Sequence, residues 1–421
     1  MKRLLVILFL AVFGLMSWQC SDNEPPRNPG GPDDPDDPPV MGPGDISRVD
    51  QGLIDAVNRF SLKIFKAVEA QEAAGSNIFI SPLSMSLALG MTSNGAKGET
   101  KQSMKSVLEI ADLSDSVINE SYYNLTDFLV NLDPTVIFEI GNSIWYMDGY
   151  TVDTDFYNIS RDYFDAGIYP IDFCASWAAD TINHWVDVKT HGKITEIIKP
   201  PLGLDIVVML LNAIYFKGTW TYQFDPEETF DGKFFLEDGT IVDCRMMLRQ
   251  DSVMYYEDGL LKAVDLPYGD GAFAMAVIMP KYNVAMDEVV EVLTPESWSL
   301  MMPHFVLTEI PLAMPRFKFE YSIPLNEILM DMGMAVAFAP GMADFSRMFV
   351  DINFWIDKVL QKTFVQVDES GTEAAAVTIV VGTLGPSPHM TVNRPFLFVI
   401  HERESNSIQF IGKVANPVWE D

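Results

Sequence analysis

The stretch from residue 369 to residue 386 constrains the fold most, because it combines the composition of a strand with the glycine and proline residues that are typical of a loop. It begins Glu-Ser-Gly-Thr-Glu-Ala-Ala-Ala-Val-Thr and includes a β-branched run, Val377 to Val381, without charge. Such a run favours a buried strand and promotes unwanted strand pairing when it is exposed. Gly382, Gly385 and Pro386 nevertheless follow it, as they would in a loop.

Side-chain alternation divides this stretch into two rows with different properties. One row would hold Thr372, Ala374, Ala376, Thr378, Val380 and Gly382, and the other Glu373, Ala375, Val377, Ile379 and Val381. Every residue of the first row is small or β-branched, so this face could pass across a packed core without a clash. We therefore predict a loop built to become a strand. An ordinary exposed strand and an Ala-rich helical turn are the alternatives.

The first nineteen residues have the features of a signal peptide. Lys2 and Arg3 precede an apolar core, Leu4 to Met16, that is too short to span a membrane. Cys20 follows directly, which is typical of a bacterial lipoprotein that is cleaved before a cysteine and lipidated there. A plain secretory signal with an incidental cysteine is the alternative.

Residues 20–45 are rich in proline and aspartate and hold almost nothing apolar. Such a segment cannot bury enough surface to fold and stays extended. We therefore predict an exported, membrane-anchored lipoprotein with a stalk, at the outer membrane or cell surface; a secreted protein is the alternative. The lipid anchor would be the only membrane contact.

Residues 46–421 contain no second linker and are expected to form one large α+β domain. Helical periodicity predicts helices within residues 46–68, 81–92, 99–110, 118–132 and 180–188. Strands are predicted at 207–215, 240–247, 272–279, 312–321, 364–367, 396–401 and 408–413. Helices would thus come early and strands late. Cys174 and Cys244 allow one disulfide at most.

Charge and motifs exclude several classes of function. The net charge of −31 argues against nucleic acid or an anionic surface as the partner. The chain has no G-x-S-x-G elbow and no H-E-x-x-H motif, so an enzyme is not expected. Its five histidines lack the spacing of metal ligands, apart from two that lie seven residues apart. We predict no metal and no cofactor.

Several segments, taken in order, resemble the serpin family from about Ile46 to Pro417. They are Ser81-Pro82-Leu83-Ser84, Gly95-Ala96-Lys97-Gly98-Glu99-Thr100, Ile182-Asn183-His184-Trp185-Val186, Thr190-His191-Gly192-Lys193-Ile194, Asn212 to Trp220, Leu312-Ala313-Met314-Pro315-Arg316-Phe317, Gly371 to Thr378, and a C-terminal hairpin of Arg394–Ile400 with Phe410–Pro417. The resemblance implies three β-sheets, about nine helices and an exposed reactive loop. In inhibitory members a protease attacks the loop and is trapped as an acyl-enzyme when the loop inserts into the central sheet.

The resemblance also implies roles for individual residues. The loop hinge would comprise Gly371, Thr372, Glu373, Ala374, Ala375, Ala376 and Thr378. Its small residues indicate a suicide-substrate inhibitor of serine endopeptidases, with cysteine endopeptidases as a second class. A non-inhibitory serpin, acting as a binding protein or a protease substrate, is the alternative. A set here named the shutter, beneath the opening sheet, would hold Ser81, Ser84, Asn212 and Gln361. Trp220 and Glu369 would form the breach, where the loop first enters.

The attacked bond is predicted to be Leu384–Gly385, with Thr383–Leu384 as the next choice. Counting from Gly371 as in the family would place the bond before Pro386, where few serine proteases cut. A leucine before the bond suits a chymotrypsin-, elastase- or subtilisin-like target with an apolar pocket. Gln361 stands where the family usually has His, which puts the kinetics of sheet opening in question. No basic stripe lies near Lys97–Lys105, so no glycosaminoglycan cofactor is expected, and we expect a monomer.

Overall fold

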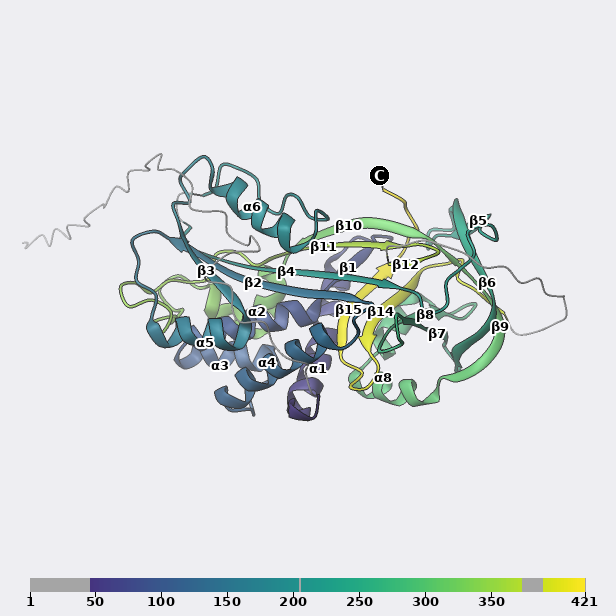
Figure 1. Ribbon diagram of the computed structural model, residues 1–421, viewed down its shortest axis with the longest axis horizontal. Helices are drawn as coiled ribbons and strands as arrows, with labels where there is room; N and C mark the ends of the chain where they lie inside the picture. Colours follow the sequence, from purple (N-terminus) through teal and green to yellow (C-terminus); the bar gives the residue numbers. More distant parts are fainter. Residues whose placement is uncertain (1–45, 204–205, 373–388, 421) are drawn as a thin grey trace, which may run out of the picture.

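Two small sheets lie side by side and form a central layer (Figure 1). The computed structural model describes residues 46–203, 206–372 and 389–420. Within them, the first sheet has the order β12 (Gly371–Thr372), β4 (Val208–Thr219), β2 (Ile137–Met147) and β3 (Ala166–Ile171). The second sheet pairs β10 (Phe317–Pro324) with β11 (Leu360–Val367). No backbone hydrogen bond joins β4 to β11 in the described part of the chain, so this layer is divided.

A nine-stranded sheet packs against this layer. Its strands, in spatial order, are β1 (Ile78–Ile80), β15 (Ile408–Val414), β14 (Phe396–Glu402), β8 (Phe273–Pro280), β7 (Leu261–Tyr268), β6 (Ile241–Glu257), β9 (Val306–Pro315) and β13 (Met390–Thr391), with β5 (Phe230–Phe235) paired to β6. The predicted C-terminal hairpin is part of this sheet, where β14 and β15 lie next to each other: Phe396 pairs with Val414 and Ile400 with Phe410. All residues of β14 and β15 are buried, which explains the apolar run from Phe396 to Ile400 and the largely apolar sequence of β15.

Helices cover both faces of the central layer (Figure 1). One face carries α1 (Gln51–Gln71), α2 (Pro82–Gly95), α3 (Gly98–Val107), α4 (Asp115–Asn131) and α5 (Thr154–Phe164). The other face carries α6 (Ala178–Lys189). The remaining α-helices of the described residues are short: α7 (Met286–Val292), α8 (Pro295–Met301) and α9 (Asn326–Leu329).

Two apolar cores hold these layers together. The larger core lies among the helices, the central layer and the nine-stranded sheet. The smaller core lies between α6 and the layer, where Trp185 and Ile182 of α6 pack with Leu211 and Ala213 of β4. Alternate residues of β4 therefore face different cores, as expected for a strand covered on both faces.

Comparison with the sequence confirms the α+β class and corrects details. Each predicted helix exists, with bounds shifted by a few residues, and Ser81 and Pro82 begin α2 as N-cap and first helical residue. The single strand predicted over 312–321 is wrong. β9 ends at Pro315 and β10 begins at Phe317, because the chain leaves one sheet and enters the other at Arg316. The prediction of early helices and late strands is also wrong, since β2 and β3 lie between the early helices.

Three further observations concern the predicted classes of site. Cys174 and Cys244 are not joined by a disulfide. No helix in the described ranges is long and apolar enough to cross a membrane. Among these residues, no cluster of three or more histidine, cysteine or acidic side chains could hold a metal ion.

Candidate functional site

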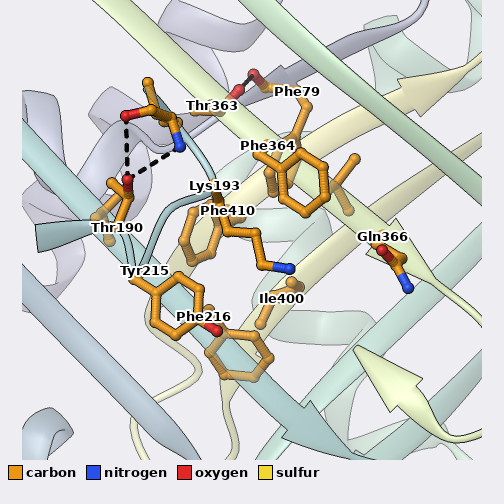
Figure 2. A pocket seen from close by; sticks show the side chains of 13 residues that line it. Phe79, Thr190, Lys193, Tyr215, Phe216, Thr363, Phe364, Gln366, Ile400 and Phe410 are labelled. Carbon is orange, nitrogen blue, oxygen red and sulfur yellow. Dashed lines mark hydrogen bonds between the residues drawn. The ribbon is translucent and has the colours of Figure 1, made fainter. Parts of the chain in front are cut away.

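The division between β4 and β11 contains a small cavity, of about 30 Å³ (Figure 2). Ile214, Tyr215 and Phe216 of β4 line one side, and residues 363–366 of β11 line the other. A strand inserted here would need about 4.8 Å of spacing on each side, far more than this cavity offers. The two sheets would therefore have to move apart to admit a strand.

The segment after α6 closes the outer side of this gap. Thr190 and Ile194 are joined by hydrogen bonds, and the Ile194 amide donates to the Thr190 hydroxyl at 3.0 Å. Lys193 extends from this segment across the ring of Phe364, 5.4 Å from its centre (Figure 2). Burial lowers the pKa of the Lys193 ammonium, and nearby Lys217 and Lys318 act in the same direction. This cover must shift when the gap widens.

The shutter residues lie at the other end of the gap, and Gln361 joins two of them. The Gln361 amide oxygen accepts from the Ser81 backbone N–H at 3.0 Å, while its NH₂ donates to the Ser81 carbonyl at 2.9 Å and the Ser84 hydroxyl at 3.0 Å. All three residues are buried. An amide has both the donor and the acceptor that this arrangement requires, so Gln361 fits the position without titrating.

Asn212 is the fourth shutter residue and makes different contacts. Its NH₂ donates to Asn142 of β2 at 2.8 Å. Its amide oxygen is buried and has no hydrogen-bond partner among the described residues. The structure therefore brings Ser81, Ser84 and Gln361 together but leaves Asn212 on the opposite side of the gap. A buried, unpaired oxygen is a cost that a further donor could remove.

The breach residues lie where β11 ends and the loop begins. The Trp220 indole stacks on Tyr268, with ring centres 4.4 Å apart, and donates to the Asp368 carbonyl at 3.0 Å. The carbonyls of Glu369 and Ser370 accept from the amides of Phe224 and Trp220, each at 2.9 Å. The buried Glu369 carboxylate accepts from the Thr229 hydroxyl at 2.7 Å.

The chain then turns back and enters the gap. Gly371 pairs with Thr219 and Thr372 with Gly218, antiparallel to β4, while Gly371 also bridges Asp368. Gly371 has φ +137°, and a Cβ built there would lie 2.4 Å from the Gly218 carbonyl oxygen. Glycine is thus required at this position for two reasons, the positive φ angle and the close approach of the β4 backbone. The first two hinge residues are already part of the central layer.

Two residues of this site were missed by sequence reasoning. Thr229 holds Glu369 although 140 positions separate them, and nothing in the local sequence around Thr229 indicates this contact. Thr363 donates to the Phe79 carbonyl at 2.6 Å and lies beside the gap. Its place on the buried face of a strand with alternating burial could have been found by extending the predicted strand from 364 back to 360.

The remaining predicted residues lie outside the described residues. They are Cys20, Glu373, Ala374, Ala375, Ala376, Thr378, Thr383, Leu384 and Gly385, together with the predicted signal peptide and stalk. The roles proposed for these residues stay predictions.

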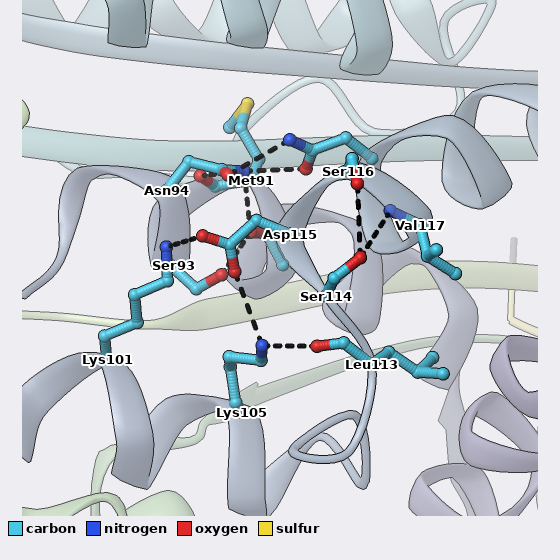
Figure 3. A network of polar contacts seen from close by, with 12 residues as sticks. Met91, Ser93, Asn94, Lys101, Lys105, Leu113, Ser114, Asp115, Ser116 and Val117 are labelled. Atoms are coloured by element: carbon cyan, nitrogen blue, oxygen red, sulfur yellow. Dashed lines mark hydrogen bonds and ion pairs between the residues drawn. The ribbon is translucent and has the colours of Figure 1, made fainter.

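The region around Lys97–Lys105 carries an ion-pair network (Figure 3). Asp115, at the start of α4, accepts from Lys101 at 2.5 Å and from Lys105 at 3.3 Å. Burial alone would raise the pKa of the Asp115 carboxyl, but the hydrogen bonds and charges of the two lysines outweigh it and hold this pKa below its usual value. Both lysines thus have a partner within the protein, although the single carboxylate balances only one of their two charges. That no sulfated glycan acts here stays a prediction.

Comparisons with known proteins agree with this architecture. The family described as "Serpin (serine protease inhibitor)" matches residues 55–417. The intracellular coagulation inhibitor 2 of Tachypleus tridentatus is 33% identical over 377 residues, which cover 87% of this chain and 91% of that protein.

Solved structures give the same result and distinguish two states. The thermophilic serpin tengpin in its native state has a TM-score of 0.81 at 30% identity, covering 90% of this chain and 97% of its own. Tengpin in its latent state has a lower TM-score of 0.76 at 31% identity, over 87% and 98% of the two chains. A thyroxine-binding globulin complexed with thyroxine has a TM-score of 0.80 at 25% identity, over 87% and 99%. The described fold is therefore more similar to the native than to the latent form.

Proposed function

The chain belongs to the serpin family, and we propose that it is a suicide-substrate inhibitor of serine endopeptidases, with cysteine endopeptidases as a second class of target. The family consists generally of protease inhibitors rather than enzymes. The observation that carries the proposal is the divided central layer, into which the first two hinge residues are already paired.

The chemistry follows from the predicted bond, Leu384–Gly385. The protease nucleophile attacks the carbonyl carbon of Leu384, and the bond to the Gly385 nitrogen breaks. The protease is then attached to Leu384 as an ester, or as a thioester for a cysteine enzyme. Hydrolysis would release the cleaved protein, so inhibition requires that the loop inserts first. About fifteen residues at roughly 3.3 Å each would move the attached protease by ~50 Å.

The inserted state would be the more stable one. Each new ladder hydrogen bond contributes on the order of 1 kcal/mol, and the β-branched side chains of the loop would be buried. The uncleaved protein is then held by a kinetic barrier rather than by equilibrium. Separating β4 from β11, and releasing the cover around Lys193, would contribute to that barrier.

The register of β12 predicts where the rest of the loop would lie. Gly371 is opposite Thr219 on β4 and Asp368 at the end of β11. Seven residues further along the loop, Thr378 would therefore lie between Asn212 and Gln361, which are seven residues back along the two sides. Its hydroxyl would supply a donor for the unpaired oxygen of Asn212. A loop with small residues on this face fits that position.

The test is incubation of residues 46–421 with a chymotrypsin-like and an elastase-like protease, followed by denaturing electrophoresis and intact mass. We expect a covalent complex and a released peptide that begins at Gly385. Ala376→Arg, which places a charge in the row facing the core, should be cleaved without trapping the protease. Glu373→Arg, on the other row, is the matched control and should still trap it.

A second function is favoured by the likeness to a thyroxine-binding globulin, a serpin-fold protein complexed with a small ligand. In this alternative the chain is a binding protein or a protease substrate. Cleavage within the loop with no complex, and with no rise in thermal midpoint afterwards, would support it and overturn inhibition.

We also propose that residues 1–19 are removed and that Cys20 is lipidated. Residues 20–45 would then tether the exported domain to the outer membrane or cell surface. The composition of the segment supports this. Expression of the full chain in a bacterial host, with intact mass and fractionation, tests it. Cys20→Ser should move the protein from the membrane fraction to the soluble fraction; retention in the membrane would contradict the proposal.

A further inference from the structure

A second cavity, of about 770 Å³, lies away from the gap between β4 and β11. Three segments form it: Phe235–Glu237 at the end of β5, Pro280–Asp287 between β8 and α7, and Asn393–Pro395 before β14. Its volume is in the range of pockets that bind small molecules, which are typically about 300–1,000 Å³. Nothing in the inhibitory mechanism uses this cavity.

Arg394 is the residue that gives the cavity its chemistry. It is half-buried, and no carboxylate or carbonyl pairs with its guanidinium among the described residues. This is notable in a chain with 59 acidic residues and 28 lysines and arginines. Lys281, by contrast, is paired with Glu257 at 2.6 Å. Arg394 is therefore the cation of this cavity that remains available to an anion.

Apolar side chains surround this cation. The guanidinium of Arg394 lies 5.9 Å from the centre of the Tyr282 ring, and Tyr282 is 80% exposed. Phe235, which is 45% exposed, and the half-buried Val284 line the same cavity. Large exposed apolar side chains gathered around a cavity indicate a binding surface.

Acidic residues restrict the ligand further. Glu237 and Asp287 also line the cavity and are exposed. A ligand with several negative charges would meet these carboxylates, whereas one anionic group directed at Arg394 would not. The best match is a molecule with a single anionic group and an apolar body.

We propose that this cavity binds a small amphipathic anion, whose carboxylate or sulfonate pairs with Arg394 and whose apolar body lies against Tyr282, Phe235 and Val284. Such a ligand would join all three segments. Since the Phe235 amide donates to the Asn393 carbonyl at 2.8 Å, and Asn393 follows β13 closely, the ligand would also hold the segment that returns from the reactive loop. Binding should therefore raise the thermal midpoint of the uncleaved protein.

The experiment is fluorescence titration of uncleaved residues 46–421 with 8-anilinonaphthalene-1-sulfonate. Its neutral analogue N-phenyl-1-naphthylamine, which lacks the sulfonate, is titrated in parallel. We expect one saturable site for the anion, and binding weakened about tenfold in Arg394→Gln, the loss expected for one charge-assisted contact. Tyr282→Ala should also weaken binding.

Tyr222→Ala is the matched control. Tyr222 is 57% exposed and lies over an arginine, Arg249, at 5.1 Å, but Asp251 occupies that guanidinium at 2.8 Å and the pair is outside the cavity. Its removal should leave binding unchanged. If Arg394→Gln melts far below the parent, Tyr282→Ala decides the test, because its side chain is mostly in solvent.

Competition by decanoate and decanedioate provides a second measurement. Decanoate should displace the dye more effectively than the dicarboxylate, because of Glu237 and Asp287. Equal binding by the parent and Arg394→Gln, or equal affinity for the neutral analogue, would overturn the proposal and leave an unspecific apolar surface. These outcomes do not depend on protease inhibition, so the two proposals can fail separately.

Discussion

The indole nitrogen of Trp220 donates a hydrogen bond to the backbone carbonyl of Asp368, 3.0 Å away, at the point where the loop leaves β11. This bond joins the two halves of the divided layer at one end. Gln361 holds β11 to Ser81 and Ser84 at the other end. Gly371 lies at the first of these two ends, where it pairs with Thr219 and bridges Asp368.

Trp220→Phe keeps an aromatic ring against Tyr268 but removes the bond to Asp368. We expect a loss of about 1 kcal/mol in the free energy of unfolding, the usual contribution of one hydrogen bond. We also expect a changed stoichiometry of inhibition, because the bond that joins the two sheets at the breach end of the gap is lost. Urea unfolding and titration against a chymotrypsin-like protease measure the two effects.

The control is Trp298→Phe, which removes a comparable indole bond to the Asn406 carbonyl, 3.1 Å long, far from the gap. It should lose similar stability and keep the stoichiometry. Identical changes in stoichiometry for both variants would show that general destabilisation, and not the breach, is responsible.

Gln361→Leu preserves approximate shape and removes three hydrogen bonds. It leaves buried groups of Ser81 and Ser84 without these partners, and each such group costs about 1–3 kcal/mol. We expect a clear fall in the urea midpoint. Gln366→Leu, on the same strand and with a single bond to Asp368, should cost much less. A similar fall for both would contradict a special role for Gln361.

Gly371→Ala should disrupt the pairing of β12 with β4. The three atoms nearest to the new Cβ would all be backbone atoms, at 2.4–2.6 Å, so the clash cannot be relieved by moving a side chain. We expect a loss of about 3 kcal/mol or more, measured by thermal and urea unfolding. Gly239→Ala is the control, since Gly239 has φ +84° with nothing within 4 Å and should show only the dihedral strain of about 1–2 kcal/mol. Equal losses would mean that the contact with β4 contributes nothing.

Asp115 gives a prediction for pH. Its pKa is lowered in the folded protein from the ordinary value of 3.8, so its pairing with Lys101 and Lys105 stabilises the fold above that value. The stabilisation should be lost as the pH falls below 3.8 and through the lowered folded pKa. Because the Asp115 side chain is 47% exposed, solvent screens the pair and the effect should be below about 1 kcal/mol.

Asp115→Asn should accordingly lower stability at pH 7 but not at the lowest pH at which the protein is folded. Thermal midpoints measured across pH 3–7 check this. Asp112 is exposed and lies in the turn before α4, so Asp112→Asn is the control. Its thermal midpoint should differ little from that of the parent at every pH from 3 to 7. A constant difference between parent and Asp115→Asn at every pH would contradict the ion-pair account.

The sequence predicted the elements whose pattern is local. The cap at Ser81, the periodicity of α1 and the alternation in β11 depend on neighbours within a few residues, and these elements are present. β2 and β3 were missed because both of their faces are covered in part, by α6 and by the main core, which removes clear alternation.

Pairings across long separations could not be predicted in the same way. Thr229 forms a hydrogen bond with Glu369, and Gln361 with Ser81, only because the fold brings distant segments together. The resemblance to a family indicated that Ser81, Ser84 and Gln361 share a region. It did not indicate that Asn212 lies apart from them with an unpaired oxygen.

The divided layer also has a consequence for solutions of many molecules. β4 has twelve residues and β11 has eight, and apart from the two residues of β12 the facing edges carry backbone groups without strand partners in the described chain. Once the two sheets have moved apart, edges of this kind can pair with any strand of suitable sequence, including the loop of a second molecule. Insertion of a molecule's own loop is a first-order process, whereas joining two molecules is second order. The ratio of the two should therefore depend on protein concentration, and the monomer should be kept by dilution.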